Sequence, residues 1–531
     1  MTETSHRRRR SVVGRSVVRR AVVTIAALAA ATTMLSGCLY AAIPPESAAT
    51  PAPSREPDVD GAPAGFEEFY GQQLDWQACS GADAGSYDCA TVTAPLDWTD
   101  PSVGTIDLAV IRRAATDGDA IGSLLTNPGG PGASGYDLIA QSSSFAVGAA
   151  LSDVYDVIGF DPRGVGRSTA VRCFDAAEMD AYLFDIPADP RGSQGWTDEL
   201  TARNQDFVKA CEAGSDGILP YITTDNAARD MDLLRAVLGD TKLNYLGYSY
   251  GTFLGATYAK LFPERVGRLV LDGAIDPSVS GLDVSTTQAI GFESALRAYM
   301  ADCLQGRSCP FSGSVDEGMA ALGTLLASVD SSPLTGSDGR ELGADTLMTA
   351  IIAALYSQDS WSYLSKALTD ALAGDADTAL TLADFYYARS DGTYQDNSTE
   401  AFRAYNCMDY PLDSSQADKD AADALVRQKA PTIAPYWQGV DVCEVWPYPP
   451  TGVREKIAAD GAAPIVVVGT TNDPATPYEW SVSLAEQLSS GVLVTRQGEG
   501  HTGYNKGNTC VDTAVEDYLV DGTVPQNGLT C

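Results

Sequence analysis

Histidine is almost absent from this chain of 531 residues, which contains only His6 and His501. Positive charge is also scarce, because 35 Lys and Arg residues stand against 70 Asp and Glu residues and leave a formal net charge of -35. So acidic a surface repels nucleic acid, and we expect no nucleic-acid partner. The sequence also lacks Cys and His clusters with the spacing of zinc ligands, so we expect no metal.

Long apolar runs are missing except near the N-terminus. Seven Arg residues precede an apolar run at 21–35, which is too short for a comfortable membrane span and is typical of an export signal. The run ends in Leu-Ser-Gly-Cys, which resembles a bacterial lipobox with Cys38 as the acylated first residue of the mature protein. We therefore predict a lipoprotein signal peptide at 1–37, although ordinary signal cleavage is the alternative.

Export follows from this segment, by either the general secretory or the twin-arginine route, between which the sequence does not decide. We expect the mature protein to be anchored by lipid alone at the outer face of the bacterial cell membrane, or released to the envelope or the extracellular space. Ten cysteines remain after Cys38, and an even number in an exported chain favours disulfides. We predict that neighbours in the sequence pair and that each link stabilises a surface loop: Cys79 with Cys89, Cys173 with Cys211, Cys303 with Cys309, Cys407 with Cys443, and Cys510 with Cys531.

The composition divides the rest of the chain into segments. Residues 38–65 are rich in Ala, Pro, Ser and acidic residues, which predicts a disordered tether. Short β-branched runs then alternate with helical patterns at 66–276 and 405–531, whereas helical periodicity dominates 277–404. We expect an inserted helical lid domain at 277–404, the alternative being helices that merely pack on the core.

The alternating pattern predicts the α/β class, with a mostly parallel central sheet flanked by helices. A first strand is expected at 106–111, and buried parallel strands are expected at 122–126, 155–160, 243–246, 269–271 and 465–468. In such sheets the chemistry lies beyond the carboxyl ends of the strands. The oligomeric state is not indicated by any pattern.

One segment has the context of a nucleophile elbow. Gly-Tyr-Ser-Tyr-Gly at 247–251 follows an apolar run and precedes a helix-compatible stretch. The small flanking glycines permit a strained turn from strand to helix that exposes the Ser249 hydroxyl. Because an unaided hydroxyl is a poor nucleophile, a base must remove its proton. His6 leaves with the signal peptide, so the base is predicted to be His501.

A third residue must hold the imidazole tautomer. Asp473 follows the strand expected at 465–468 and completes the chain order Ser, Asp, His of the α/β-hydrolase fold. The alternative for Asp473 is a purely structural role in an Asx-turn before Pro474. Glu499 is the other candidate for the acid of the triad. We predict a triad of Ser249, Asp473 and His501.

A glycine-rich loop could supply the oxyanion hole. Asn-Pro-Gly-Gly-Pro-Gly at 127–132 follows an expected strand and brings bare backbone close to a substrate carbonyl. We assign the two donors to the backbone amides of Gly130 and Tyr250. A phosphate cradle is the alternative, but the loop lacks both GxGxxG spacing and the Lys of a P-loop.

These motifs carry a family resemblance. The segments 127–132, 159–168, 247–251, 473–474 and 500–501 occur in one order, and the match runs from about residue 74 to residue 510. Together they resemble the tripeptidyl aminopeptidase-like family of secreted α/β-hydrolases, which are relatives of the prolyl aminopeptidases. Residues 127–128 read Asn-Pro where prolyl aminopeptidases have His-Gly, so the length of the released peptide stays open.

The resemblance implies an exopeptidase that removes short peptides, tripeptides included, from free N-termini through an acyl-enzyme and without a cofactor. A free α-ammonium group needs an acidic partner. By its place in the family-like segment 406–409, Asp409 is the predicted partner, with an ordinary surface carboxylate as the alternative. Arg163 is expected to pair with a carboxylate behind the site. An esterase or lipase-like hydrolase on the same triad, and an inactive binding protein of the cell envelope, are the competing functions.

Overall fold

The computed structural model describes residues 54–80, 87–437 and 439–531. The predicted signal peptide, Cys38 and most of the predicted tether lie outside the described residues. Within these ranges no helix combines the length and the apolar character needed to cross a membrane.

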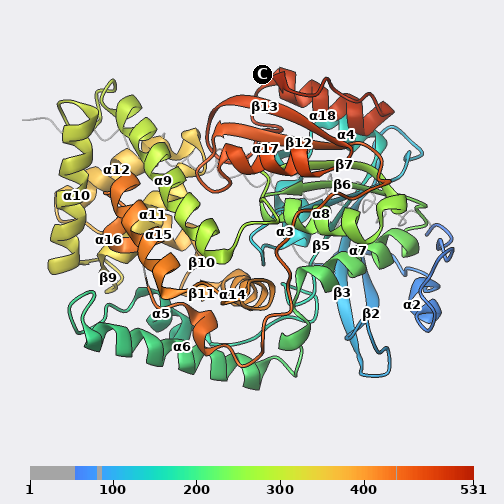
Figure 1. Cartoon of the computed structure of the whole chain (residues 1–531), viewed down its shortest axis with the longest axis horizontal. Coiled ribbons are helices and arrows are strands. Elements are labelled where there is room, and N and C mark those ends of the chain that lie inside the picture. Colours follow the sequence, from blue (N-terminus) through green and yellow to red (C-terminus); the bar gives the residue numbers. More distant parts are fainter. Residues whose placement is uncertain (1–53, 81–86, 438) are drawn as a thin grey trace, which may run out of the picture. The chain divides into compact units, whose positions relative to one another are not determined.

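A ten-stranded sheet forms one side of the described chain, and a group of helices lies beside it (Figure 1). The segment from β5 to β14 is parallel, and β1, β2 and β3 continue the sheet antiparallel at the β5 edge. In spatial order the strands are β1 (Gln77–Ala78), β2 (Asp88–Pro95), β3 (Thr105–Arg113), β5 (Asp156–Phe160), β4 (Ser123–Asn127), β6 (Leu243–Tyr248), β7 (Val266–Asp272), β12 (Ile465–Asn472), β13 (Gly491–Glu499) and β14 (Leu529–Thr530). The predicted α/β-hydrolase fold with a mostly parallel sheet is confirmed.

Helices cover both faces of this sheet, which explains why its central strands read as continuous apolar runs. Alternate residues of β4 and β6 enter opposite cores: Leu125 and Tyr245 on one face, Leu124 and Leu246 on the other. The first face is packed by α7 (Thr224–Val237), α8 (Tyr250–Leu261) and α17 (Tyr478–Gln487). The second is packed by α3 (Gly135–Ala146), α4 (Ala149–Val154) and α18 (Thr509–Asp521).

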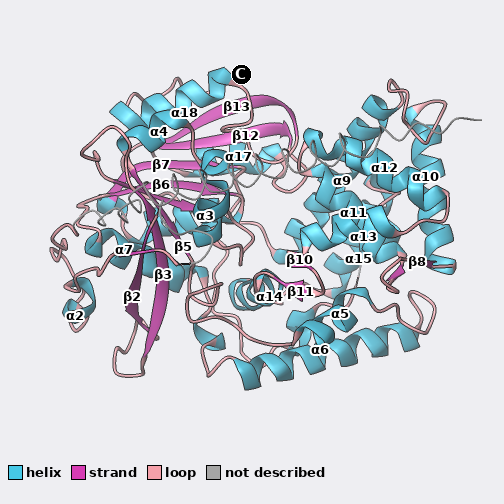
Figure 2. Cartoon of the chain, turned by 180° about the vertical axis from the view of Figure 1, so that it is seen from behind, coloured by secondary structure: helices cyan, strands magenta, loops and turns pink. Residues whose placement is uncertain are grey.

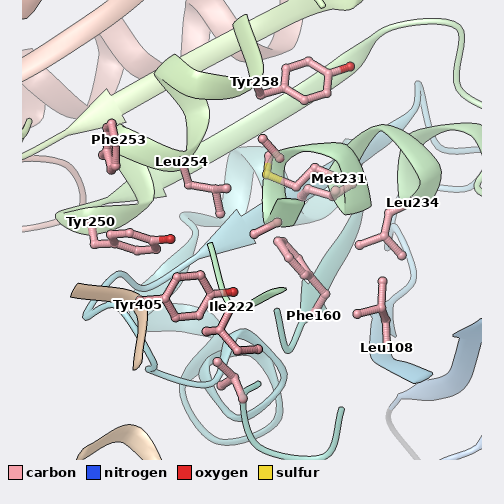
Figure 3. Packing of buried hydrophobic residues seen from close by; sticks show 14 of the residues in the cluster. Leu108, Phe160, Ile222, Met231, Leu234, Tyr250, Phe253, Leu254, Tyr258 and Tyr405 are labelled. Atoms are coloured by element: carbon pink, nitrogen blue, oxygen red, sulfur yellow. The ribbon is translucent and has the colours of Figure 1, made fainter. Parts of the chain in front are cut away.

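The first of these cores contains the aromatic residue that follows the elbow serine. Figure 3 shows Tyr250 and Tyr405 close together, and their ring centroids are 5.8 Å apart. Tyr405 comes from α14 (Ser398–Asp409), so this helix packs on the sheet although its first residues, 398–404, fall within the predicted lid.

A separate helical group has its own hydrophobic core (Figure 2). It contains α9 (Gly281–Cys303), α10 (Val315–Ser331), α11 (Ala344–Leu355), α12 (Trp361–Leu372), α13 (Asp377–Tyr386), α15 (Gln416–Lys429) and α16 (Ala434–Trp437). The group therefore differs from the predicted lid at 277–404, because α15 and α16 lie beyond that boundary and pack in the same core. Periodicity alone could not assign the buried residues in and beside these two helices to this core, namely Val426, Ile433 and Ala434.

The remaining elements complete the described chain. The α-helices are α2 (Glu67–Tyr70), α5 (Ala176–Phe184) and α6 (Gln194–Gly214), and the 3-10 helices are η2 (Leu219–Tyr221), η3 (Pro263–Arg265), η4 (Gln358–Ser360) and η5 (Val442–Val445). Two small hairpins pair β8 (Leu334–Thr335) with β9 (Glu341–Leu342) and β10 (Arg389–Ser390) with β11 (Thr393–Tyr394).

Five disulfides join neighbouring cysteines, which confirms the predicted pairing: Cys79–Cys89, Cys173–Cys211, Cys303–Cys309, Cys407–Cys443 and Cys510–Cys531. The expectation that each disulfide stabilises a surface loop is wrong for two of them. Cys211 is fully buried in α6, and Cys407–Cys443 links α14 to η5.

The end of the predicted tether is ordered against the sheet, which corrects the boundary at residue 65. Arg55 forms ion pairs of 3.2 Å with both Asp156 and Asp240, and Asp58 pairs with the buried Arg235 at 2.6 Å. The composition of this segment predicted disorder because it offers little apolar surface, but these ion pairs and a backbone hydrogen bond from Asp58 to Ala236 hold it in place.

Candidate active site

Ser249 occupies the sharp turn between β6 and α8. Its φ of +56° is rare for a residue with a side chain and marks a strained backbone. The flanking glycines are required, since a Cβ atom on Gly247 would lie 2.5 Å from the carbonyl oxygen of Gly251, and one on Gly251 would lie 2.9 Å from that of Asn127. The local geometry is that of a nucleophile elbow.

Asp473 and His501 lie together at the carboxyl ends of β12 and β13. The Nδ1 atom of His501 is 2.9 Å from each carboxylate oxygen of Asp473. The carboxylate also accepts hydrogen bonds from the backbone N–H groups of Ala475, Thr476 and Thr502. Since both oxygens are held, the carboxylate can fix the ring orientation and leave the proton on Nδ1.

The sequence reasoning overlooked the hydroxyl of Thr476. Its Oγ1 donates to Asp473 at 3.0 Å and lies 3.3 Å from Nδ1 of His501. Thr476 lies in the loop that supplied Asp473, but nothing in its spacing distinguished it from an ordinary turn residue.

The other imidazole nitrogen faces a closed environment. Nε2 of His501 is buried and has no hydrogen-bond partner among the described residues, and the whole side chain is only 10% exposed. Tyr356, which follows α11 in the helical group, lies edge-on to the ring with centroids 5.2 Å apart, and its carbonyl oxygen accepts the N–H of His501. The helical group therefore contacts the candidate base directly, and its role as a lid stays a prediction.

Ser249 and His501 both approach the carboxyl end of β7. The Ser249 N–H donates to the carbonyl oxygen of Asp272 at 2.9 Å, and a Cβ atom on Gly273 would lie 3.2 Å from Cε1 of His501. No hydrogen bond joins the Ser249 hydroxyl to Nε2 in the described structure. Such bonds are often long before substrate binds, so the proton transfer between these residues stays a prediction.

The glycine-rich loop at 127–132 runs along the elbow. A Cβ atom on Gly129 would lie 2.8 Å from Cβ of Ser249 and 3.1 Å from the backbone nitrogen of Tyr250, so only glycine fits. Tyr250 is the first residue of α8, and its N–H therefore has no intrahelical acceptor. Gly130 follows Gly129 in the same loop, and its role as the second oxyanion donor stays a prediction.

Asp409 lies at the end of α14 and is not a surface carboxylate, because it is only 4% exposed. It accepts hydrogen bonds from the Thr224 hydroxyl at 2.6 Å and from the Thr224 N–H at 3.0 Å. The same hydroxyl is hydrogen-bonded to the Tyr250 phenol. Burial raises the pKa of Asp409 to about 6. Asp409 thus reaches the elbow through Thr224, and its contact with a substrate ammonium group stays a prediction.

Glu400 is a second acid near the site, and no sequence pattern indicates its importance. It lies in the first turn of α14, where Ser398, Ala401 and Phe402 pack against Gly132 of the glycine-rich loop. Burial, followed by the nearby Asp396 carboxylate, raises the pKa of Glu400 to about 7. Among the described residues no other side chain bonds to its carboxylate.

The structure also places the rival acid Glu499 and the arginine that is expected to pair behind the site. Glu499 accepts a hydrogen bond from Asn472 instead of contacting the imidazole, so Asp473 is the acid in contact with His501. Arg163 forms a fully buried, bidentate pair with Asp230, through Nε and Nη2 at 2.7 Å each, which confirms its expected structural partner. In the described ranges no group of three or more His, Cys, Asp or Glu side chains could hold a metal.

Comparisons with known proteins extend over nearly the whole chain. Residues 430–531 match the family described as TAP-like protein. The chain is 40% identical over 512 residues to carboxylesterase B of Mycobacterium tuberculosis, covering 94% of this chain and 96% of the relative.

Two further relatives carry peptidase names. The chain is 35% identical over 528 residues to serine protease Hip1 of Mycobacterium tuberculosis, covering 95% of this chain and 96% of the relative. It is 30% identical over 473 residues to tripeptidyl aminopeptidase of Streptomyces coelicolor, covering 86% of each. The names of these relatives thus divide between peptide and ester hydrolysis.

Proposed function

The chain belongs to the TAP-like family of α/β-hydrolases and is a serine hydrolase, and we propose that it is an exported aminopeptidase that releases short peptides from free N-termini. The observation that carries this proposal is the pairing of Asp473 with His501. A carboxylate 2.9 Å from Nδ1 keeps the proton on that atom, so Nε2 is the nitrogen that can accept one.

In the proposed reaction, Nε2 of His501 accepts the Ser249 hydroxyl proton while Oγ bonds to the substrate carbonyl carbon. The backbone N–H groups of Tyr250 and Gly130 stabilise the negative charge on the former carbonyl oxygen. The C–N bond then breaks, and His501 returns its proton to the leaving amine. Water adds to the acyl carbon while its proton passes to the same nitrogen. The bond from Oγ to the acyl carbon then breaks, His501 returns the proton to Oγ, and the peptide acid leaves. Asp473 stabilises the imidazolium throughout.

The first experiment tests the nucleophile. A fluorophosphonate probe should label the wild-type protein and should not label Ser249→Ala. Asp473→Asn should slow labelling by about 10⁴-fold, because the imidazole then has the wrong tautomer. A folded wild-type protein that resists labelling would overturn the enzyme proposal and favour an envelope binding protein.

Substrate class is the next question. The names of two relatives support peptide hydrolysis, while the carboxylesterase B name supports ester hydrolysis as a second candidate. We expect kcat/KM for a tripeptide amide with a free N-terminus to exceed that for its N-acetylated form by at least about tenfold, the value of one charge-assisted contact. Equal values for the two peptides, together with faster cleavage of short acyl esters, would favour the esterase.

Two carboxylates are candidates for binding the substrate ammonium group. Asp409 is the residue predicted from the sequence. Glu400 is the acid beside the glycine-rich loop whose carboxylate has no ion pair with a described side chain, although the Arg403 charge lowers its pKa. The isosteric variants Asp409→Asn and Glu400→Gln separate them. Substitution of the true partner should raise KM for peptides with a free N-terminus and leave KM for N-acetylated peptides unchanged. If neither variant changes the ratio, both assignments are wrong.

For localisation, we propose a lipid anchor at Cys38, supported by the arginine-rich segment, the apolar run and the lipobox-like ending. Cells given an alkyne-tagged fatty acid should incorporate the tag into the wild-type protein and not into Cys38→Ala. The wild-type protein should also fractionate with membranes. A wild-type protein without the tag would refute lipidation and favour ordinary signal cleavage.

A further inference from the structure

Asp272 is a buried acid that the proposed reaction does not use. It ends β7, where it lies opposite Tyr248 of the nucleophile strand β6 on one side and Val468 of the acid strand β12 on the other. Its side chain is 0% exposed, and no ion pair to it exists in the described chain.

The main chain and the side chain of Asp272 contact two different parts of the site. Its carbonyl oxygen accepts the N–H of Ser249 at 2.9 Å. Its carboxylate accepts the N–H of Gly503 at 2.8 Å through Oδ1 and the N–H of Tyr504 at 2.8 Å through Oδ2. One residue thus holds the backbone of the candidate nucleophile and the loop that follows the candidate base.

A charged carboxylate at this position lowers the stability of the folded state, because burial disfavours its charge. Burial raises the pKa of Asp272 to about 6, and hydrogen bonds from Tyr504 and Gly503 oppose that rise. The charged or titratable groups that face it are His501, Lys506 and Tyr248. Asn is a poor substitute, since its NH2 group would replace one acceptor oxygen beside these N–H donors and leave a single oxygen to accept from both.

We propose that Asp272 is a positioning residue, which ties the Ser249 backbone to the 503–504 loop so that hydroxyl and imidazole keep a fixed separation. The inference rests on the proposed roles of Ser249 and His501. This role differs from a purely structural one for two reasons. Asp272 links the backbone of Ser249 to the loop that follows His501, and its negative charge acts on the His501 imidazole.

The test compares Asp272→Asn with Asp240→Asn in the full-length protein. Asp240 is a matched control because its carboxylate also accepts a backbone N–H, that of Ser123 at 3.2 Å, and burial also raises its pKa. Asp240 lies before the amino end of β6, whereas Ser249 follows the carboxyl end of the same strand. Fluorophosphonate labelling and peptide hydrolysis are measured from pH 5 to pH 9 on protein whose circular dichroism matches that of the wild type.

Asp272→Asn should slow labelling by about 10- to 100-fold with KM unchanged, as expected when a reacting group is displaced by about 1 Å. The acidic limb of the rate profile should also move to lower pH, because removing a nearby anion favours the neutral imidazole. Asp240→Asn should change neither. Wild-type rates and an unshifted acidic limb in Asp272→Asn would overturn the proposal.

A second variant covers the case in which Asp272→Asn does not fold. A Cβ atom on Gly503 would lie 2.8 Å from Val468, so Gly503→Ala displaces the same loop and leaves the carboxylate in place. It should also slow labelling, and a wild-type rate would refute the positioning role. Failure of the proposed function is distinguishable, because the wild-type protein itself would then resist labelling.

Discussion

Asp409→Asn provides a quantitative test of the buried network beside the elbow. In the folded protein the Asp409 carboxylate is desolvated, and no described cation forms an ion pair with it. Asn keeps the shape and can preserve both contacts with Thr224. Its oxygen accepts the Thr224 N–H, and its amide group donates to the Thr224 hydroxyl, which can then donate to the Tyr250 phenol.

The expected effect follows from the pKa of Asp409, which burial raises from 3.8 to about 6. The folded state therefore binds this proton more tightly than the unfolded state, so the free energy of unfolding decreases as the pH rises from about 4 to about 6. Above pH 6 the full cost is about 3 kcal/mol, and about half of it is already present at pH 5. Asn cannot ionise, so its stability relative to the wild type should increase by about 1.5 kcal/mol between pH 5 and pH 8.

Urea unfolding at pH 5 and pH 8, with equal m-values in both proteins, measures this difference. Asp316→Asn controls for the loss of one negative charge, because the Asp316 side chain is 82% exposed, and its effect should be nearly independent of pH. The reasoning would be refuted if the difference between Asp409→Asn and the wild type were the same at both pH values, or smaller at pH 8.

Three further predictions follow from single contacts. Thr476→Val should slow fluorophosphonate labelling about tenfold, since it removes the hydroxyl shared by the triad carboxylate and imidazole, whereas Thr476→Ser should retain the rate, and equal rates in both would contradict this role. Arg163→Met should lower the free energy of unfolding by about 3–5 kcal/mol, because Asp230 would be left buried without its cation, and a loss below about 1 kcal/mol in urea unfolding would contradict this. Replacing Cys173–Cys211 by two alanines should cost about 1.5 kcal/mol more than replacing Cys303–Cys309, because their sequence separations are 38 and 6, and the reverse order in urea unfolding would argue against loop closure as the cause.

The parts of this fold that could be predicted from the sequence are those with a strong local cause. A central parallel strand is buried on both faces, so β12 contains the continuous apolar run Ile-Val-Val-Val and was recognised from it. The glycines around Ser249 were recognisable because an elbow tolerates no Cβ at those positions. His501 was found by elimination, since only one other histidine exists in the chain.

Residues whose role depends on contacts between distant segments gave no comparable signal. Asp272 ends its strand as any polar residue could, and its importance arises only because β7 lies between β6 and β12, so that Ser249 and the loop after His501 both reach it. Glu400 lies in α14, and Tyr356 directly follows α11. The periodicity of these helices indicates which face is buried, but not against which partner. Local pattern therefore predicts the candidate triad, whereas the residues that contact the triad depend on strand order and helix packing. For this reason the Asp272→Asn and Glu400→Gln experiments add information that no motif in the sequence contains.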